Sequence, residues 1–399
     1  MWTRSVRCRT VVATVLTIMV AVPSASAAPR FREVGRALGL PRHTNSWSIG
    51  TGRVNAGRAP DLVMSTHAAA FVYRVGRGTM HRMFFRAGDD PHGCAVADVD
   101  ANGLGDVYCS RGADYGTLRK RNHLWLQVRA GDFVERAGDW GVTDPYGRGR
   151  HVVFFELDGD GRPDLFVGNE HPRANDRPSP NRTFVNVRGE RFRQVRIGAT
   201  AEVGARCARV GDHDGDGWDD LLVCGQDRLH LYRNARDREG GRRLIDVAGR
   251  LKIALPGVRD AWLGDLDADG DADLVLVLAG RLQVRPGRGD GTFRRPVLDL
   301  AVTVPSSVAV GDLDGRRGPD LVLVRGCAGG SNLADEVLLD RDGWAFGRVH
   351  LPGRPAGCGD VAATIDVDRD GADEVVIMNG ARGGGRGPVQ VFTTGSSWR

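Results

Sequence analysis

The stretch Asp212–Asp220 reads DHDGDGWDD, and five of its nine residues are carboxylates. Like charges this close repel one another, so the run by itself is typical of a solvated loop. Its pattern is D-x-D-x-D-G-x-x-D, and that pattern recurs along the chain. The recurrence, rather than the single stretch, indicates the fold.

Four other copies keep oxygen-bearing side chains at positions 1, 3, 5 and 9. They are DVDANGLGD (98–106), ELDGDGRPD (156–164), DLDADGDAD (265–273) and DVDRDGADE (366–374). Two copies are degraded, DLDGRRGPD (312–320) and RVNAGRAPD (53–61). The seven copies start 45 to 58 residues apart, a period typical of propellers and other arrays of small units.

Each copy is flanked by short apolar segments that are expected to be strands. Segments such as AWLGD precede the loops, and β-branched runs such as DLVLVL follow them. Two further strand-like segments complete each repeat, for example HLYRN and FRQV. The sequence therefore predicts an all-β fold, a seven-bladed β-propeller of four-stranded antiparallel blades. A solenoid or two smaller sandwiches are the alternatives.

The ends of the chain predict how the ring closes. The last repeat stops at VQVF (389–392) without a fourth strand, and FREV (31–34) supplies a matching one. Closure would leave no bare sheet edge. The expected closing strand is 31–35, and the expected blades are about 47–89, 91–140, 148–197, 203–250, 257–299, 304–350 and 358–394.

The first 27 residues have the features of a secretory signal peptide. A basic start precedes the apolar run Val11–Val22, and Ala25-Ser26-Ala27 is a small-residue cleavage site. We therefore expect a secreted, monomeric propeller of residues 28–399 without a membrane span. Removing three arginines lowers the net charge from +5 to +2, so the composition does not favour a nucleic-acid partner.

The acidic loops predict metal sites. Oxygen ligands in such number, with a glycine at position 6 that permits the turn, select Ca²⁺. We expect about five Ca²⁺ sites. The predicted ligands are Asp98, Asp100, Asn102 and Asp106; Glu156, Asp158, Asp160 and Asp164; Asp212, Asp214, Asp216 and Asp220; Asp265, Asp267, Asp269 and Asp273; and Asp366, Asp368, Asp370 and Glu374.

Three features of the loops set further expectations. In the sixth copy Arg316 stands where a ligand is needed, and its guanidinium is expected to replace the ion. The first copy keeps only Asn55 and Asp61 and is expected to be metal-free. His213, at position 2 of the fourth loop, is expected at the surface. The alternative for all seven is an Asp-rich turn held by side-chain to backbone hydrogen bonds.

Six cysteines remain after cleavage, and their positions predict disulfides. Cys94 and Cys109 flank one loop in the same register as Cys207 and Cys224 flank another, which places each pair within reach across a hairpin. Cys327 and Cys358 are left and are expected to link the sixth and seventh blades. Free buried thiols are the alternative.

The pattern resembles extracellular FG-GAP/VCBS-repeat propellers, the repeat class of integrin α-subunit heads. Segments such as NRTFVNVRGERFRQV and HLYRN also resemble the ASPIC/UnbV, cartilage acidic protein-like group. The resemblance covers about residues 31–394, although the Phe-Gly element itself is mostly absent. It implies that positions 1, 3, 5 and 9 of the intact loops ligate calcium, and it implies no activity.

Three irregular segments, 110–121, 169–181 and 325–335, should emerge on one face, where extended loops often carry binding. Ordinary variable loops are the alternative. Four histidines of the first three blades, His67, His92, His151 and His171, could also converge on one propeller face. The predicted ligand contacts are Tyr115, Arg119, Lys120, Arg121, Glu170, His171 and Arg173.

No catalytic motif stands out, and the obvious acids are assigned to metal. We expect an extracellular binding or adhesion module for a glycan, a cell-wall polymer or an extracellular protein. A secreted polysaccharide lyase or hydrolase and a scaffold without a small ligand are the alternatives.

Overall fold

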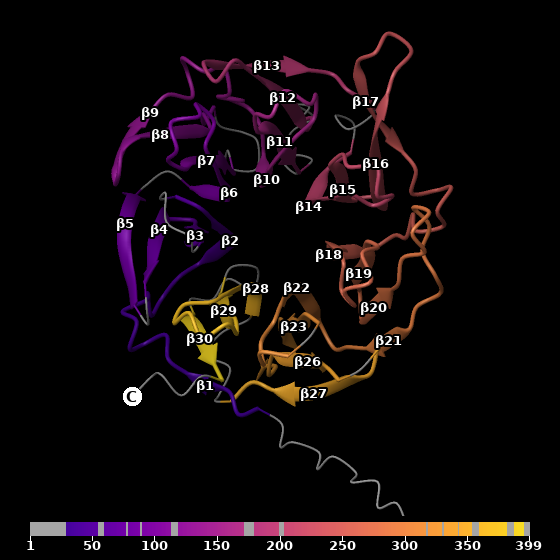
Figure 1. The fold of residues 1–399 in the computed structure, drawn as a ribbon. Coiled ribbons are helices and arrows are strands. Elements are labelled where there is room, and N and C mark those ends of the chain that lie inside the picture. The colour runs from indigo at the N-terminus through magenta and orange to yellow at the C-terminus, as the bar shows by residue number, and fades with distance from the viewer. Residues whose placement is uncertain are drawn as a thin grey trace, which may run out of the picture.

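The computed structural model describes residues 29–54, 60–76, 79–87, 90–112, 119–170, 179–198, 203–316, 318–328, 331–341, 343–352, 359–380 and 387–394. Within these residues the strands form seven four-stranded antiparallel sheets, arranged as blades around one axis (Figure 1). The described segments contain no helix, so none could span a membrane as a helix. The predicted all-β, seven-bladed propeller is confirmed.

The first four blades each use four consecutive strands, ordered from the axis outward. Their bounds are β2 (Ser46–Gly52), β3 (Asp61–Thr66), β4 (Ala69–Gly76) and β5 (Thr79–Ala87); β6 (Pro91–Ala97), β7 (Asp106–Arg111), β8 (His123–Arg129) and β9 (Asp132–Glu135); β10 (Gly149–Phe155), β11 (Asp164–Asn169), β12 (Arg182–Val187) and β13 (Arg191–Val195); and β14 (Ala205–Gly211), β15 (Asp220–Gly225), β16 (Leu229–Arg236) and β17 (Arg242–Asp246).

Blades 5 to 7 follow the same order. Their bounds are β18 (Val258–Gly264), β19 (Asp273–Leu278), β20 (Arg281–Arg285) and β21 (Leu298–Ala301); β22 (Pro305–Gly311), β23 (Asp320–Arg325), β26 (Glu336–Asp340) and β27 (Phe346–His350); and β28 (Gly359–Ile365), β29 (Glu374–Asn379) and β30 (Val389–Thr393). A small hairpin of β24 (Cys327–Ala328) and β25 (Ser331–Asn332) lies outside the sixth sheet.

The last blade is completed by the N-terminal strand, as the sequence predicts. In β1 (Arg32–Glu33), Arg32 pairs with Thr393 and Glu33 with Phe392 of β30. Phe31 is buried beside Phe392 in the cluster between blades 6 and 7. The strand β1 is therefore held in the last blade both by hydrogen bonds to β30 and by the burial of Phe31.

The core consists of apolar layers between neighbouring blades. The second strand of each blade is buried on both faces; for example, Leu222 packs toward blade 5, and Val223 packs toward blade 3. This explains why these strands read as continuous β-branched and leucine runs rather than as alternating patterns. Each blade therefore packs against both of its neighbours through apolar side chains.

Every innermost strand carries one bulge near its beginning, where its register with the second strand shifts. The residues left out of these ladders, here named the bulge residues, are Trp47, His92 with Gly93, Arg150, Arg206, Arg259, Ser306 and Asp360. The acidic loops lie at the other end of the same strands. The molecule thus has a loop face and a bulge face.

Candidate functional site

The acidic loops join the first and second strands of the blades, and their carboxylates gather in space. Candidate ligand atoms of Asp98, Asp100 and Asp106 lie within 4.8 Å of one another, and so do those of Glu156, Asp158 and Asp164 in the next blade. In the fourth loop Asp212 gathers with Asp214 and Asp216. The structure therefore brings together, in three of the loops, acids that the sequence predicted as ligands.

Hydrogen bonds from the backbone hold these acids in place. At position 1, Asp98 accepts the amide protons of Asn102 at 3.0 Å and Gly103 at 2.8 Å. At position 5, Asn102 accepts the amide proton of Leu104 at 2.8 Å. Asp265 and Asp269 make the matching contacts in the fifth loop. The loops therefore do form the Asp-rich turn with side-chain to backbone hydrogen bonds that was the alternative to a metal site. These hydrogen bonds also fix the positions of the carboxylate oxygens.

The position 9 acid has a second role that the sequence did not suggest. In the second blade both oxygens of Asp106 are used: one accepts the amide proton of Val99 at 2.9 Å, and the other that of Gln127 at 2.8 Å. This contact from position 2 to position 9 recurs in every described hairpin. The position 9 residues are Asp61, Asp106, Asp164, Asp220, Asp273, Asp320 and Glu374.

The same acids carry the clearest electrostatic signal. Burial, with the neighbouring loop acids, raises the pKa of Asp106 and of Asp164 to about 7. A nearby cation would lower these values by favouring the charged form. In the fourth loop, Oδ1 of Asp214 is buried and makes no hydrogen bond to the described residues. Hard oxygen donors, like-charge crowding and a buried oxygen of this kind fit Ca²⁺.

Arginines pair with acids in three of the loops of the described chain, and in the third loop Arg162 lies 3.2 Å from Asp160. Arg233 pairs with Asp214 and lies 2.9 Å from Asp216 in the fourth loop. In the sixth loop Arg316 lies 3.6 Å and Arg341 lies 3.3 Å from the same oxygen of Asp314. The guanidinium of Arg316, expected in place of the ion, thus lies near an acid of its loop. The fourth loop has a cation that the sequence analysis missed, because Arg233 comes from the third strand.

His213 does not lie at the surface, so that expectation is wrong. Its side chain is buried, and Nδ1 contacts Asp220. The reason is the hairpin geometry, which turns position 2 inward in all seven loops. The other residues at this position are Val54, Val99, Leu157, Leu266, Leu313 and Val367, and all are buried. The apolar character of these six residues was the signal in the sequence.

Two predicted disulfides are present within blades. Cys94 bonds Cys109, and Cys207 bonds Cys224. Each pair faces across the ladder between the first two strands, which is the register that the sequence spacing indicated. The proposed partner of Cys327, Cys358, lies outside the described residues, so that bridge stays a prediction.

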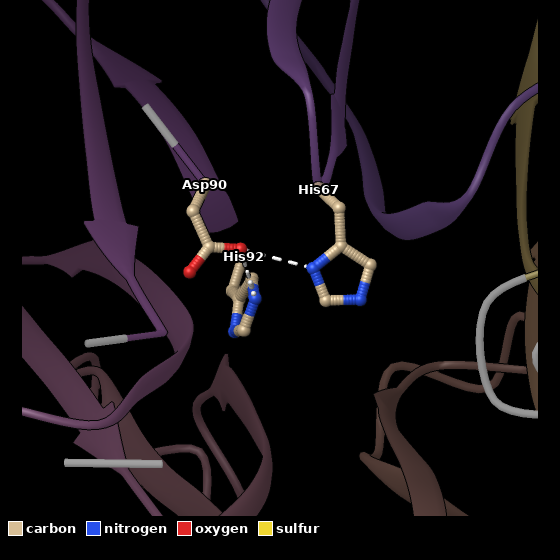
Figure 2. Close-up of side chains that lie close together, drawn as sticks. All are labelled: His67, Asp90 and His92. Atoms are coloured by element: carbon tan, nitrogen blue, oxygen red, sulfur yellow. Dashed lines mark hydrogen bonds and ion pairs between the residues drawn. The ribbon is translucent and has the colours of Figure 1, made fainter. Parts of the chain in front are cut away.

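The bulge face of blades 1 to 3 carries a cluster of polar and aromatic side chains. Figure 2 shows Asp90 between two histidines: its Oδ1 lies 2.9 Å from Nδ1 of His67 and 3.0 Å from Nε2 of His92. The ring of Trp47 stacks on that of His92, with centroids 3.9 Å apart. Arg150 contacts Nδ1 of His92 and lies over the Trp47 ring. Two of the four histidines expected to converge, His67 and His92, thus lie together, whereas His171 lies outside the described residues.

Protonation in this cluster follows from the contacts. Burial, with the neighbouring Arg150 cation, lowers the pKa of His92 to about 4. Burial acts in the opposite direction on Asp90, but hydrogen bonds from His67 and His92 hold the pKa of that carboxyl well below its usual range. At neutral pH the cluster therefore contains a neutral His92 and an ionised Asp90.

Two of the predicted ligand contacts belong to the same network. Lys120 Nζ lies 3.6 Å from Asp90, and Glu170 accepts from Arg150 at 2.8 Å. Arg119 lies 5.9 Å from the Tyr146 ring centre, and Arg121 is exposed nearby in the chain. Tyr115, His171 and Arg173 lie outside the described residues.

Residues 265–323 match the FG-GAP-like repeat family. They span the fifth acidic loop, the rest of that blade and the sixth loop. This match, over part of the chain, and the seven-bladed fold fit an FG-GAP-repeat propeller.

The following known proteins resemble this chain at low sequence identity. Cartilage acidic protein 1 of Mus musculus is 25% identical over 197 residues, which are 46% of this chain and 28% of that protein. The chain therefore matches little more than a quarter of the length of that relative. BBS1N, solved in complex with ARL6DN, gives a TM-score of 0.54 at 10% identity over 90% of this chain and 94% of its own. That likeness is one of fold alone.

A lectin from Agrocybe aegerita, described as recognising non-reducing terminal N-acetylglucosamine, gives a TM-score of 0.49 at 17% identity. The alignment covers 78% of this chain and 80% of the lectin.

Proposed function

We propose that this FG-GAP-repeat propeller is a secreted, calcium-stabilised module that binds a glycan or a protein outside the cell. The observation that carries the proposal is the difference between the two faces. The loop face gathers fixed acids, whereas the bulge face holds an ordered set of aromatic and charged side chains. Rigid scaffolds that present such sets commonly serve recognition.

Calcium would bind the intact loops through the acids at positions 1, 3, 5 and 9. The ion would supply positive charge that offsets carboxylate repulsion and ties the first hairpin of a blade together. The loops starting at Asp98, Glu156, Asp265 and Asp366 have no arginine at position 5. The loop at Glu156 shares Asp160 with Arg162. The loop at Asp212 also has the full set of acids, but it shares Asp214 and Asp216 with Arg233.

Export is supported by two independent features. The first 27 residues read as a signal peptide, and the two disulfides suit an oxidising compartment. Calcium concentrations outside cells are also high enough to load weak extracellular sites.

The test uses residues 28–399 on a panel of polysaccharides, cell-wall polymers and extracellular proteins, with Ca²⁺ or with EDTA. Retention without release of fragments is the expected result. Release of oligosaccharides would indicate a polysaccharide-degrading enzyme instead of a binding module. Absence of retention by every glycan and protein would contradict the proposal.

A further inference from the structure

The residues at the seven bulges form a set that the repeat pattern does not explain. A bulge inserts one extra residue, breaks the alternation of the strand and re-aims a side chain. All seven lie near the beginning of an innermost strand, beside the axis (Figure 1). Because the residue at each bulge does not take part in the regular ladder, it can be substituted without disrupting the hydrogen bonds of the blade. The set is therefore suited to recognition.

In blades 1 to 3 the bulge residues contact one another. Trp47 stacks on His92, and the Arg150 guanidinium carbon lies 4.8 Å from the centre of the Trp47 ring. Arg150 also donates to His92. Three blades thus contribute one continuous surface made of an indole, an imidazole and a guanidinium.

Two carboxylates hold this surface in one arrangement. Asp90 accepts from His67 and His92, and Glu170 accepts from Arg150 at 2.8 Å and pairs with Arg148 at 3.0 Å. The packing is close, because a Cβ added at Gly112 would lie 2.1 Å from Cε1 of His92. Side chains fixed in this way lose little conformational entropy when a ligand binds.

Two histidines and a carboxylate suggest a metal site, but one contact argues against it. A guanidinium only donates, so Nδ1 of His92 accepts from Arg150, and the ring proton is on Nε2. That proton is donated to Asp90 at 3.0 Å, so Nε2 has no lone pair for a metal. Histidine ligands usually donate their second nitrogen to an acceptor instead.

The accessible atoms of the cluster suit a different ligand. The side chain of His67 is 44% exposed and that of Lys120 is 27% exposed. The side chain of Trp47 is partly exposed, although its indole nitrogen is buried and has no hydrogen-bond partner among the described residues. Arg148, Arg150 and Lys120 outnumber Asp90 and Glu170, so the described groups carry one positive charge in excess. The next bulge residue, Arg206 in blade 4, is exposed.

We propose that this cluster binds an acidic sugar unit of a glycan, one that carries a carboxylate or sulfate group. The inference rests on the proposed function and names the ligand class of its binding face. The partly exposed ring of Trp47 offers apolar surface for the C–H face of the sugar ring. Lys120, with His67 beside it, binds the anionic group through charge-assisted hydrogen bonds.

The test is titration calorimetry of the calcium-loaded protein with oligogalacturonate and with the same oligosaccharide methyl-esterified at its carboxylates. A sulfated oligosaccharide distinguishes the two kinds of anion. We expect the ester to bind about tenfold more weakly or worse, since it lacks the charge-assisted bonds. Tighter binding of the sulfated ligand would assign sulfate instead of carboxylate within the same proposal.

Variants locate the site. Lys120→Gln and His67→Ala, both at partly exposed positions, should each lower the affinity for the acidic ligand by about 5- to 20-fold. Trp47→Ala should weaken it by about tenfold or more, with thermal unfolding as the check of folding. Arg238→Gln removes an exposed positive charge elsewhere and should change nothing.

Equal affinity for the acid and its ester, or equal effects of Arg238→Gln and Lys120→Gln, would overturn the inference. Binding only to a neutral glycan or a protein would also overturn it and leave the proposed function standing.

Discussion

Arg233 lies 2.9 Å from a carboxylate oxygen of Asp216, within the fourth acidic loop. Its Nε also pairs with Asp214, so one side chain from β16 contacts two of the four expected ligands. A guanidinium in this place competes with a divalent ion for the same oxygens. This loop, one of three with five acids in nine residues, is therefore expected to bind calcium less tightly than its sequence suggests.

Arg233→Ala should raise the affinity of the fourth loop for calcium by roughly tenfold, because it removes a competing charge. Trp218, at position 7 of this loop, lets Tb³⁺ stand in for Ca²⁺ with indole-sensitised luminescence. Trp218 also packs against Gly159 of the third loop, so Asp216→Asn is needed to subtract the fourth-loop signal. An unchanged Tb³⁺ titration in Arg233→Ala would show that the ion pair does not compete.

Asp320 should stabilise the sixth blade without metal. It accepts the amide protons of Leu313 at 2.9 Å and Asp340 at 2.8 Å. Asp320→Ala leaves the buried Leu313 donor and the part-buried Asp340 donor without their acceptor, which costs about 2–4 kcal/mol of unfolding free energy. The measurement is denaturant unfolding in EDTA, with exposed Glu239→Ala as the control. A destabilisation that appears only in Ca²⁺ would assign the residue to the ion instead.

His230 should make stability depend on pH. Burial favours its neutral ring, but hydrogen bonds to Asp246 at 2.8 Å and Asp227 at 3.0 Å raise the pKa of His230. Because the folded pKa exceeds the unfolded value of about 6.5, the added stability is complete below that pH. It is lost as the pH rises through the folded pKa.

The check is the unfolding free energy between pH 5 and pH 9 for the parent and for His230→Gln. The variant should flatten the decline above about pH 6.5, whereas His81→Gln, at an exposed histidine, should leave it unchanged. An identical decline in His230→Gln would assign the dependence to other groups.

Phe31→Ala should weaken the closure of the ring. The side chain is 8% exposed and packs with Phe392, so its loss should cost about 3–4 kcal/mol. Faster amide exchange along β30 and concentration-dependent association are the expected readouts, because the edge of β30 becomes available. Exposed Arg32→Ala is the control, and unaltered exchange in Phe31→Ala would contradict the role of this strand.

The parts of the structure that local patterns encode were predictable. The acidic loops recur with flanking strands, so the blade count and the disulfide registers Cys94–Cys109 and Cys207–Cys224 follow from spacing. The closing strand was predictable because VQVF lacked a neighbour and FREV matched it. In each case the information lies within a few residues or in a repeat.

The remaining features depend on contacts between distant segments. Arg233 enters its loop from a strand that follows it, and Arg150 meets Trp47 across two blades. The inward turn of position 2, which buries His213, is a property of the hairpin rather than of the residue. No periodicity in the sequence marks the bulges, because one extra residue leaves the apolar pattern nearly unchanged.

The pairing of Arg32 with Thr393 also sets an order of events in biosynthesis. The strand that closes the ring emerges among the first, and it must wait for β30, which is made near the end of this chain. Until then β1 has no strand to pair with, and Phe31 has no partner in Phe392. Blades 1 to 6 can assemble in sequence as they appear, but the ring as a whole can lock only in its final step.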